Sequence, residues 1–289
     1  MPSRSITVGG KTVTLDARPD RLDLRDRPYL PPVCSLPPRF PEAQALSQYL
    51  SSYVKSGLVL DQGNEGACTG YGLAAVVNYL LWTRALDAGE TRRFRSISPH
   101  MLYDLAQFYD EWPGEDYEGS SCRGAMKGWY KHGVCEATLW QKSVRAKPPA
   151  GKSKKPHKLY KPDARWARDA ATRPVGIYYR VNHQSVVDMQ AAIVNMGAIY
   201  VSADVHDGWS VELKGAKPAK RMVTHDALPV IKFSSGTAIT GGHAFALVGY
   251  NESGFVVQNS WGTDWGLSGF AILTYADWVA NGADAWVCS

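Results

Sequence analysis

The 289-residue chain lacks any long run of apolar residues. No run reaches the roughly 18 residues that a membrane-spanning helix requires, so we expect no membrane span. The first 25 residues also lack the apolar segment of a secretory signal sequence. The sequence therefore predicts a soluble protein that is cytoplasmic by default, and export by a route that needs no such signal is left open.

Cysteine is scarce and odd in number. The chain has five, at scattered positions: Cys34, Cys68, Cys122, Cys135 and Cys288. Such a set is a poor disulfide framework and leaves at least one free thiol. The segment between Cys122 and Cys135 is expected to be helical, which would hold these two roughly 20 Å apart, too far for a disulfide. We therefore expect reduced thiols throughout.

Charge is present but unevenly distributed. The net charge is +5, yet residues 142–173 hold eleven Lys or Arg against two Asp, so +9 lies in this stretch and −4 in the rest. A Lys-, Pro- and Gly-rich stretch predicts a solvated insertion. Alternatively, it could bind a small anion or phosphate through Lys152, Lys154 and Lys155, or a nucleic acid.

The residue patterns predict a β-hairpin, a strap, helices and then strands. Residues 5–15 alternate around Gly9-Gly10, which is typical of a hairpin, and the Pro-rich residues 16–41 predict an extended strap. Helices are expected over 68–83, 98–110, 123–132 and 185–197, with Ser98 and Ser185 as N-caps and Gly133 after the third. Strands of an antiparallel sheet or partial barrel are expected over 198–205, 228–233, 243–250, 254–259 and 269–275.

One thiol stands at the junction of a Gly-rich loop and a long apolar segment. Cys68 would occupy the first turn of a helix, where unpaired N–H groups favour a thiolate. His243 and Asn259 lie at the ends of two neighbouring strands and can meet if these are antiparallel. The imidazole could then take the thiol proton while the amide orients the ring. Taken alone, Cys68 or His243 could equally be a buried structural residue.

Three motifs together resemble those of the papain-like cysteine peptidases. They are "QGNEGAC" at 62–68, "HAFALVGY" at 243–250 and "GFVVQNSWGTDWG" at 254–266, and "PDRLDLRD" upstream is similar to short bacterial members of that family. The resemblance implies an α+β, two-lobed fold with a helical N-terminal lobe, an antiparallel β-barrel-like C-terminal lobe and the active-site cleft between them. It also implies a thiol-dependent endopeptidase that forms an acyl-enzyme thioester with peptide or protein substrates. We expect a monomer that needs no metal and no cofactor.

The resemblance assigns roles to particular residues. Cys68 would be the nucleophile and His243 the general base and then acid. Asn259 would orient the imidazole, and Gln62 with the Cys68 N–H would form the oxyanion hole. The substrate-binding residues implied beside them are Gly66, Ala67, Gly124, Gly242 and Trp261, the last also shielding the His–Asn pair from water.

Three positions depart from the family pattern. Glu65 stands where the family carries a half-cystine, so that disulfide is absent. Thr69 replaces the usual Trp, which makes this wall of the cleft smaller and more polar. Gly242 precedes the His where many relatives have Asp or Asn, which puts the preference of the second subsite in doubt.

The N-terminal part is expected to behave like a propeptide. Residues 1–50 would form the hairpin and strap, and 51–289 the peptidase domain, with a helical lobe over about 58–140, the basic insertion over about 142–173 and a β-rich lobe over about 175–289. We hypothesise that residues of about 20 to 45 partly occlude the cleft. The alternative is that the whole segment packs on the outside of the domain.

Two other functions remain open from the sequence. A transglutaminase or deamidase uses the same thiol and imidazole but passes the acyl group to another acceptor. A binding module could use the basic insertion for anions or nucleic acid, without catalysis.

Overall fold

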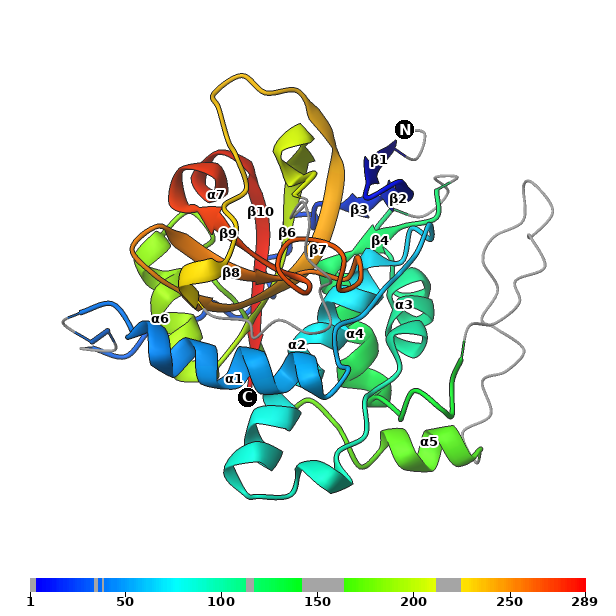
Figure 1. Ribbon diagram of the computed structural model, residues 1–289. Helices are drawn as coiled ribbons and strands as arrows, with labels where there is room; N and C mark the ends of the chain where they lie inside the picture. Colours follow the sequence, from blue (N-terminus) through cyan, green and yellow to red (C-terminus); the bar gives the residue numbers. More distant parts are fainter. Residues whose placement is uncertain (1–3, 34–35, 38, 113–116, 142–163, 212–224) are drawn as a thin grey trace.

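The structure is a computed structural model that describes residues 4–33, 36–37, 39–112, 117–141, 164–211 and 225–289 (Figure 1). Cys34 and most of the basic insertion, with Lys152, Lys154 and Lys155, lie outside the described residues. Among the described helices, none is both long and apolar enough to cross a membrane.

An antiparallel sheet forms one side of the molecule (Figure 1). Its strands, in the spatial order β5-β10-β6-β7-β8-β9, are β5 (Tyr178–Arg180), β10 (Gly282–Cys288), β6 (Ile199–His206), β7 (Ile239–Tyr250), β8 (Gly254–Gln258) and β9 (Phe270–Thr274). All five pairings are antiparallel, as predicted. The end strands β5 and β10 lie outside the predicted strands, whereas residues 228–233 were wrongly predicted as one and make only a single bridge, from Val230 to Ile272.

Helices cover the sheet and form the other side of the molecule (Figure 1). They are α1 (Ala43–Lys55), α2 (Cys68–Asp87), α3 (Pro99–Phe108), α4 (Cys122–His132), α5 (Arg165–Ala170), α6 (Val186–Met196) and α7 (Tyr275–Asn281), with short 3-10 turns at Thr91–Arg93, Asp207–Trp209 and His225–Ala227. The predicted N-caps are confirmed, since Ser98 accepts from the Met101 N–H and Ser185 from the Asp188 N–H. α1, α5 and α7 lie outside the predicted helices.

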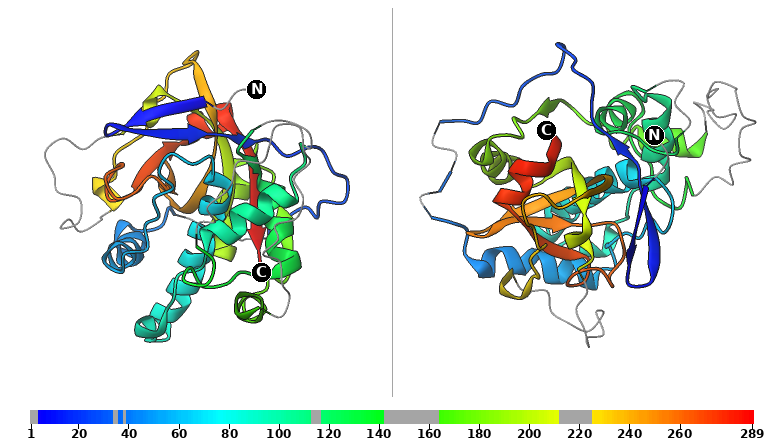
Figure 2. Two further views of the ribbon diagram at one scale, coloured as in Figure 1. Left: turned by 90° about the vertical axis from the view of Figure 1, so that its right-hand side faces the viewer. Right: turned by 90° about the horizontal axis from the view of Figure 1, so that it is seen from above.

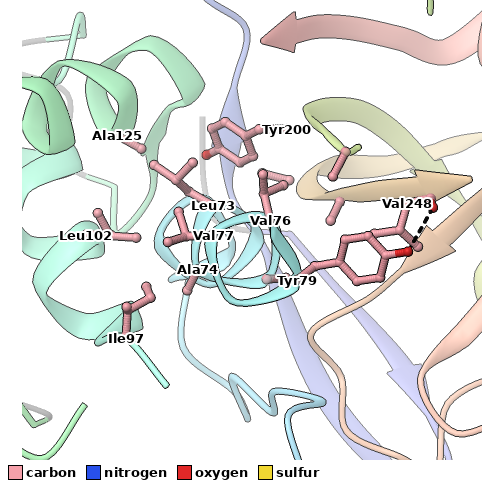
Figure 3. Close-up of a cluster of buried hydrophobic side chains, with 14 of the residues drawn as sticks. Leu73, Ala74, Val76, Val77, Tyr79, Ile97, Leu102, Ala125, Tyr200 and Val248 are labelled. Atoms are coloured by element: carbon pink, nitrogen blue, oxygen red, sulfur yellow. Dashed lines mark hydrogen bonds between the residues drawn. The ribbon is translucent and has the colours of Figure 1, made fainter. Parts of the chain in front are cut away.

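The central helix α2 is buried between the sheet and the helices α3 and α4. Its apolar side chains point to both sides, and Figure 3 shows Leu73 and Val77 facing α3 and α4 while Tyr79 reaches the strand that carries Val248. At Gly72 a side chain would collide with the β7 backbone at Ala244, so only glycine lets the helix approach the strand this closely. This contact fixes the first residue of α2, Cys68, beside β7.

The N-terminal segment crosses from the sheet to the helices. The predicted hairpin is confirmed as β1 (Arg4–Val8) and β2 (Lys11–Leu15); Figure 2 shows it in dark blue on the upper face of the molecule as drawn in Figure 1. β3 (Ala17–Arg18) then pairs in parallel with β4 (Ser120–Ser121). The inner face of the hairpin packs on the apolar cluster of the sheet through Ile6, Val8, Val13 and Leu15.

Candidate active site

The thiol of Cys68 is fully buried at the start of α2. Backbone N–H groups of Ala244, Asp16 and Thr69 donate to its sulfur. Burial raises the pKa of the Cys68 thiol to about 11, although these donors act in the opposite direction by favouring the thiolate. The sulfur therefore lies beside β7, against the residue that follows His243.

The imidazole of His243 is oriented by an amide. Its Nε2 lies 2.8 Å from Oδ1 of Asn259, and the same oxygen accepts from the Ser260 N–H at 2.8 Å. Because an amide oxygen only accepts, Nε2 carries the proton and Nδ1 is the basic nitrogen. Within the described part of the chain, Nδ1 has no hydrogen-bond partner. Burial lowers the pKa of His243 to about 4, against which the bond to Asn259 acts.

Aromatic rings enclose this imidazole. The ring of Trp261 lies 4.7 Å from that of His243, centroid to centroid, and is only 3% exposed. Trp209 approaches from another side at 6.1 Å and edge-on. Trp261, which the sequence placed over the His–Asn pair, packs on the His243 ring. Trp209 was missed, because it reaches the site from the turn after β6 and no local motif marks it.

The side chain of Gln62 is tied to the loop that carries Asn259. Its Oε1 accepts from the Ser260 hydroxyl at 2.8 Å, and its backbone N–H donates to the Ser260 carbonyl at 2.9 Å. Its Nε2 donates to the carbonyl of Glu65 at 2.9 Å. An amide nitrogen carries two hydrogens, so one of them can still serve an incoming oxyanion.

The N-terminal segment lies directly over the thiol. Asp16 donates its N–H to Cys68, and its carboxylate accepts the N–H groups of Glu118 and Gly119 at 3.0 and 2.9 Å. A side chain at Gly119 would collide with the Asp16 carbonyl, and one at Gly242 with the Ala17 carbonyl. The segment therefore runs between the chain at Gly119 and β7. The covering residues are Leu15–Arg18, and not the range of about 20 to 45 that the sequence suggested.

The residues predicted to bind substrate are only partly brought together. Gly66 and Gly242 both lie beside the covering segment, and Ala67 caps the start of α2, buried against Tyr71 and Tyr103. Gly124 is placed elsewhere: it lies inside α4 against the Ala106 carbonyl, where it permits close packing of α3 and α4.

Gly119 takes the position that the sequence assigned to Gly124. It stands just before β4, where glycine permits close approach of another chain, and the Glu-Gly-Ser-Ser run was the available signal. Thr69, which replaces the family's Trp, forms a hydrogen bond of 2.5 Å between its hydroxyl and that of Ser120. This part of the site is polar, as the sequence predicted.

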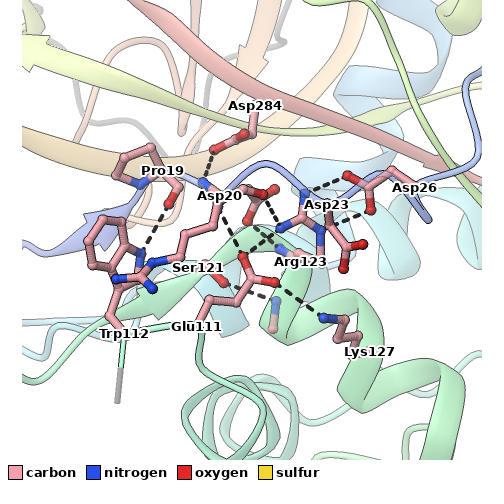
Figure 4. A network of polar contacts seen from close by, with 12 residues as sticks. Pro19, Asp20, Asp23, Asp26, Glu111, Trp112, Ser121, Arg123, Lys127 and Asp284 are labelled. Carbon is pink, nitrogen blue, oxygen red and sulfur yellow. Dashed lines mark hydrogen bonds and ion pairs between the residues drawn. The ribbon is translucent and has the colours of Figure 1, made fainter. Parts of the chain in front are cut away.

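Beyond the thiol, the N-terminal segment is anchored by a buried network of charges (Figure 4). Arg123, which is 1% exposed, pairs with Asp26 and Glu111 at 2.5 and 2.6 Å and donates its backbone N–H to Asp20 at 2.8 Å. Arg180 pairs with Asp20 at 3.3 Å and with Asp284 of β10 at 2.5 Å. The segment thus joins α4 to the sheet through its own carboxylates.

The described part of the chain offers no cluster of three or more His, Cys, Asp or Glu that could hold a metal ion. Its four cysteines are free thiols, namely Cys68, Cys122, Cys135 and Cys288.

Comparison with known proteins agrees with this geometry. The model of the papain family cysteine proteases matches residues 55–281. The uncharacterized peptidase C1-like protein L477 of Acanthamoeba polyphaga mimivirus is 27% identical over 238 residues, which cover 79% of this chain and 68% of that protein. Xylellain, a cysteine protease from Xylella fastidiosa, has a similar fold, with a TM-score of 0.66, 23% identity and 94% of each chain covered. Pro-cathepsin B of Trypanosoma congolense follows with a TM-score of 0.60, 14% identity and coverage of 94% and 87%. Since the family model spans most of the chain and the fold agrees, the chain belongs to the papain family of cysteine proteases.

Proposed function

We propose that Cys68, His243, Asn259 and Gln62 are the catalytic residues of this cysteine protease, and that it acts as an endopeptidase. The observation that carries the proposal is the His243–Asn259 bond of 2.8 Å, which leaves Nδ1 of the ring as the basic nitrogen. The next residue of β7, Ala244, has its backbone at the Cys68 sulfur. A thiol nucleophile, a base and a group that orients the base are the elements that acyl transfer requires.

The mechanism follows from the protons these groups hold. Nδ1 of His243 removes the proton from the Cys68 thiol, and the sulfur attacks the substrate carbonyl. The charge that develops on the oxygen is met by the Cys68 N–H and by the second amide hydrogen of Gln62. The imidazolium returns its proton to the departing amine, which leaves a thioester. Water, activated by the same nitrogen, then releases the acid and restores the thiol.

The covered state is a resting state. With burial raising the pKa of Cys68 and lowering that of His243, both groups are held neutral, whereas the reaction needs a thiolate beside an imidazolium. The backbone of Asp16 also lies against the sulfur, where the carbonyl of a substrate would have to approach. We therefore propose that Leu15–Arg18 restrain the enzyme and must leave before a substrate can bind.

We also propose a boundary between the restraining N-terminal segment and the protease domain. Residues 1–50 would be propeptide-like and 51–289 the protease domain, yet α1 packs Leu50 and Tyr53 into the same core as α2. This packing favours a boundary before residue 43. The coverage of 94% of both chains supports placing the protein beside xylellain within the family.

The catalytic assignment is tested with an irreversible thiol inhibitor and a quenched fluorescent peptide. We expect the inhibitor to modify Cys68, as located by mass spectrometry, and Cys68→Ala to abolish hydrolysis. Cys288→Ala, which removes a thiol far along the chain, is the matched control and should keep full activity. An added primary amine distinguishes transfer from hydrolysis, because a transglutaminase would join it to the peptide. Modification of another cysteine, or unchanged hydrolysis by Cys68→Ala, would overturn the assignment.

A further inference from the structure

The hairpin occupies one side of the site and shows which chemistry that surface accepts. It is held on the helical side by the Thr14 hydroxyl, which donates to the Asn64 carbonyl at 2.7 Å. On the sheet side its Thr7 carbonyl accepts from Ser210 at 3.3 Å. Since this segment continues into the residue on the Cys68 sulfur, it follows a path that a bound peptide would also take.

Lys11 of the hairpin forms ion pairs with two carboxylates. Nζ of Lys11 lies 3.1 Å from Oδ2 of Asp61 and 3.9 Å from Oδ2 of Asp264. Within the described part of the chain, Lys11 is the only basic residue paired with either of them. If the hairpin leaves, both carboxylates lose this partner and two negative charges remain side by side.

These carboxylates are fixed close to the catalytic residues. Asp61 directly precedes Gln62, its backbone bridges to Trp261, and its Oδ1 accepts the N–H of Gly63 at 2.9 Å. Asp264 follows Trp261 in the same loop. Because each lies in a segment that also carries a residue of the site, neither can move far without moving that residue.

The length of β2 between Lys11 and Leu15 indicates how far from the scissile bond a substrate residue would meet Asp61 and Asp264. From Leu15, which precedes the residue at the Cys68 sulfur, back to Lys11 the strand β2 extends by about 3.3 Å per residue. A long basic side chain can reach back along the strand, so the matching substrate residue lies about two to four positions from the scissile bond. It lies on the side of Trp261, away from β4.

We propose that Asp61 and Asp264 form a subsite that selects a Lys or Arg side chain of the substrate on the Trp261 side of the scissile bond. The proposal rests on the proposed function and adds the substrate class. Half-exposed ion pairs contribute modestly, so the expected preference for Lys over a neutral residue of equal length is about two- to fivefold. Salt should weaken it, because exposed charges are screened.

The experiment uses the full-length protein, with active sites counted by the irreversible thiol inhibitor. Quenched fluorescent peptides carry Lys, norleucine or Glu at each of several positions on both sides of one scissile bond, and kcat/KM is measured per titrated site. We expect Lys to exceed norleucine, and Glu to fall below it, only on the Trp261 side. In Asp264→Asn the ratio of kcat/KM for the Lys peptide to that for the norleucine peptide should shrink toward one.

A charge removed outside the subsite serves as the control for the Asp264→Asn experiment. Glu252→Gln removes one negative charge at an exposed turn between β7 and β8 and should leave the preference intact. Equal kcat/KM for Lys and norleucine peptides at every position, in a protein with titratable sites, would overturn the subsite while leaving the protease assignment standing. A preference that survives in both Asp264→Asn and Asp61→Asn would overturn it as well. Absence of any hydrolysis and of any Cys68 adduct would overturn both proposals together.

Discussion

His243 is held neutral in the covered state, and this has a consequence for stability. Nε2 of the ring is bonded to Asn259, and the rings of Trp261 and Trp209 pack against the imidazole. Adding a proton to this ring places a charge where little can solvate it. Burial lowers its pKa from the ordinary 6.5 to about 4.

The first prediction concerns the stability of the fold in acid. The unfolded chain binds a proton at the ordinary pKa of His243, and the folded chain only near 4. Above pH 6.5 the neutral ring contributes its full stability, and this contribution is lost as the pH falls from 6.5 towards 4. Between pH 7.5 and 4.5 the free energy of unfolding should therefore fall by about 2.5 kcal/mol more in the wild type than in His243→Gln. Urea unfolding at the two pH values measures this; parallel losses in both proteins would contradict it.

The site residues that the sequence revealed share one property. Cys68, His243 and Asn259 each sit in a run whose local pattern reports its chemistry and its place at the end of a helix or strand. Trp209 has no such pattern, since it reaches the site only through the packing of distant segments. The sequence pointed to the correct stretch but to Gly124 in place of Gly119. A glycine inside a helix and a glycine that contacts a distant segment look alike in the sequence, because the sequence alone does not identify the distant segment.

At the scale of elements, the N-terminal segment was predicted in kind but not in register. The alternating pattern around Gly9-Gly10 identified the hairpin, since alternation is a local signal. A proline-rich sequence without periodicity does not indicate which of its residues contact the rest of the protein. The residues that cover the site were therefore placed too far along the chain. The register is set by long-range contacts, namely the Asp16 carboxylate on Gly119 and Asp20 on the N–H of Arg123.

The exposure of the strap agrees with this placement. Leu22 and Leu24 are each 92% exposed, and Leu30 is 78% exposed. These side chains therefore fill no subsite. The contacts that retain the segment lie on either side of Ala17, in the hairpin and in the charged network.

The next prediction concerns this anchor. Asp20 accepts from Trp286 Nε1 at 2.7 Å and from the Arg123 N–H at 2.8 Å, and it pairs with Arg180. Burial and the neighbouring Asp284 raise the pKa of Asp20 to about 8, so Asp20→Asn acts through the loss of an acceptor and not through its charge. The substitution replaces one of two acceptor oxygens with an NH2 group that cannot accept, so a buried donor loses its partner and the covered state is destabilised. We expect peptide hydrolysis by the full-length protein to rise by roughly tenfold.

Asp23→Asn is the matched control, because Asp23 lies on the same strap but pairs with the exposed Arg25. Its rate should stay near that of the wild type. An unchanged rate in Asp20→Asn, or an equal rise in both variants, would argue that the segment does not restrain the enzyme through this anchor.

At the scale of the whole molecule, the network around Arg123 unites parts that are far apart in the sequence. Its members come from the N-terminal segment, from the turn after α3, from α4 and from the last strand (Figure 4). The two apolar clusters lie on opposite faces of the sheet, and the hairpin belongs to the one away from α2. The N-terminal segment thus contributes to the fold as well as covering the site.

The last prediction separates these two contributions. Arg123→Met keeps much of the side-chain volume but removes the nearest cation of Asp26 and of Glu111, which keep only Arg180 at 3.6 Å and Lys127 at 3.2 Å. Breaking a buried pair from one side costs about 3–5 kcal/mol. A thermal scan should show the unfolding midpoint lowered by at least about 6 °C, given roughly 2–4 °C per kcal/mol for a chain of this size. Adding Asp26→Leu to Arg123→Met removes one stranded carboxylate, so the double variant should regain part of the loss although it has one more substitution. It should also hydrolyse peptide faster than the wild type, because Asp26 no longer anchors the strap. Strictly additive losses in the double variant would show that Arg123 acts through packing and not through its charge.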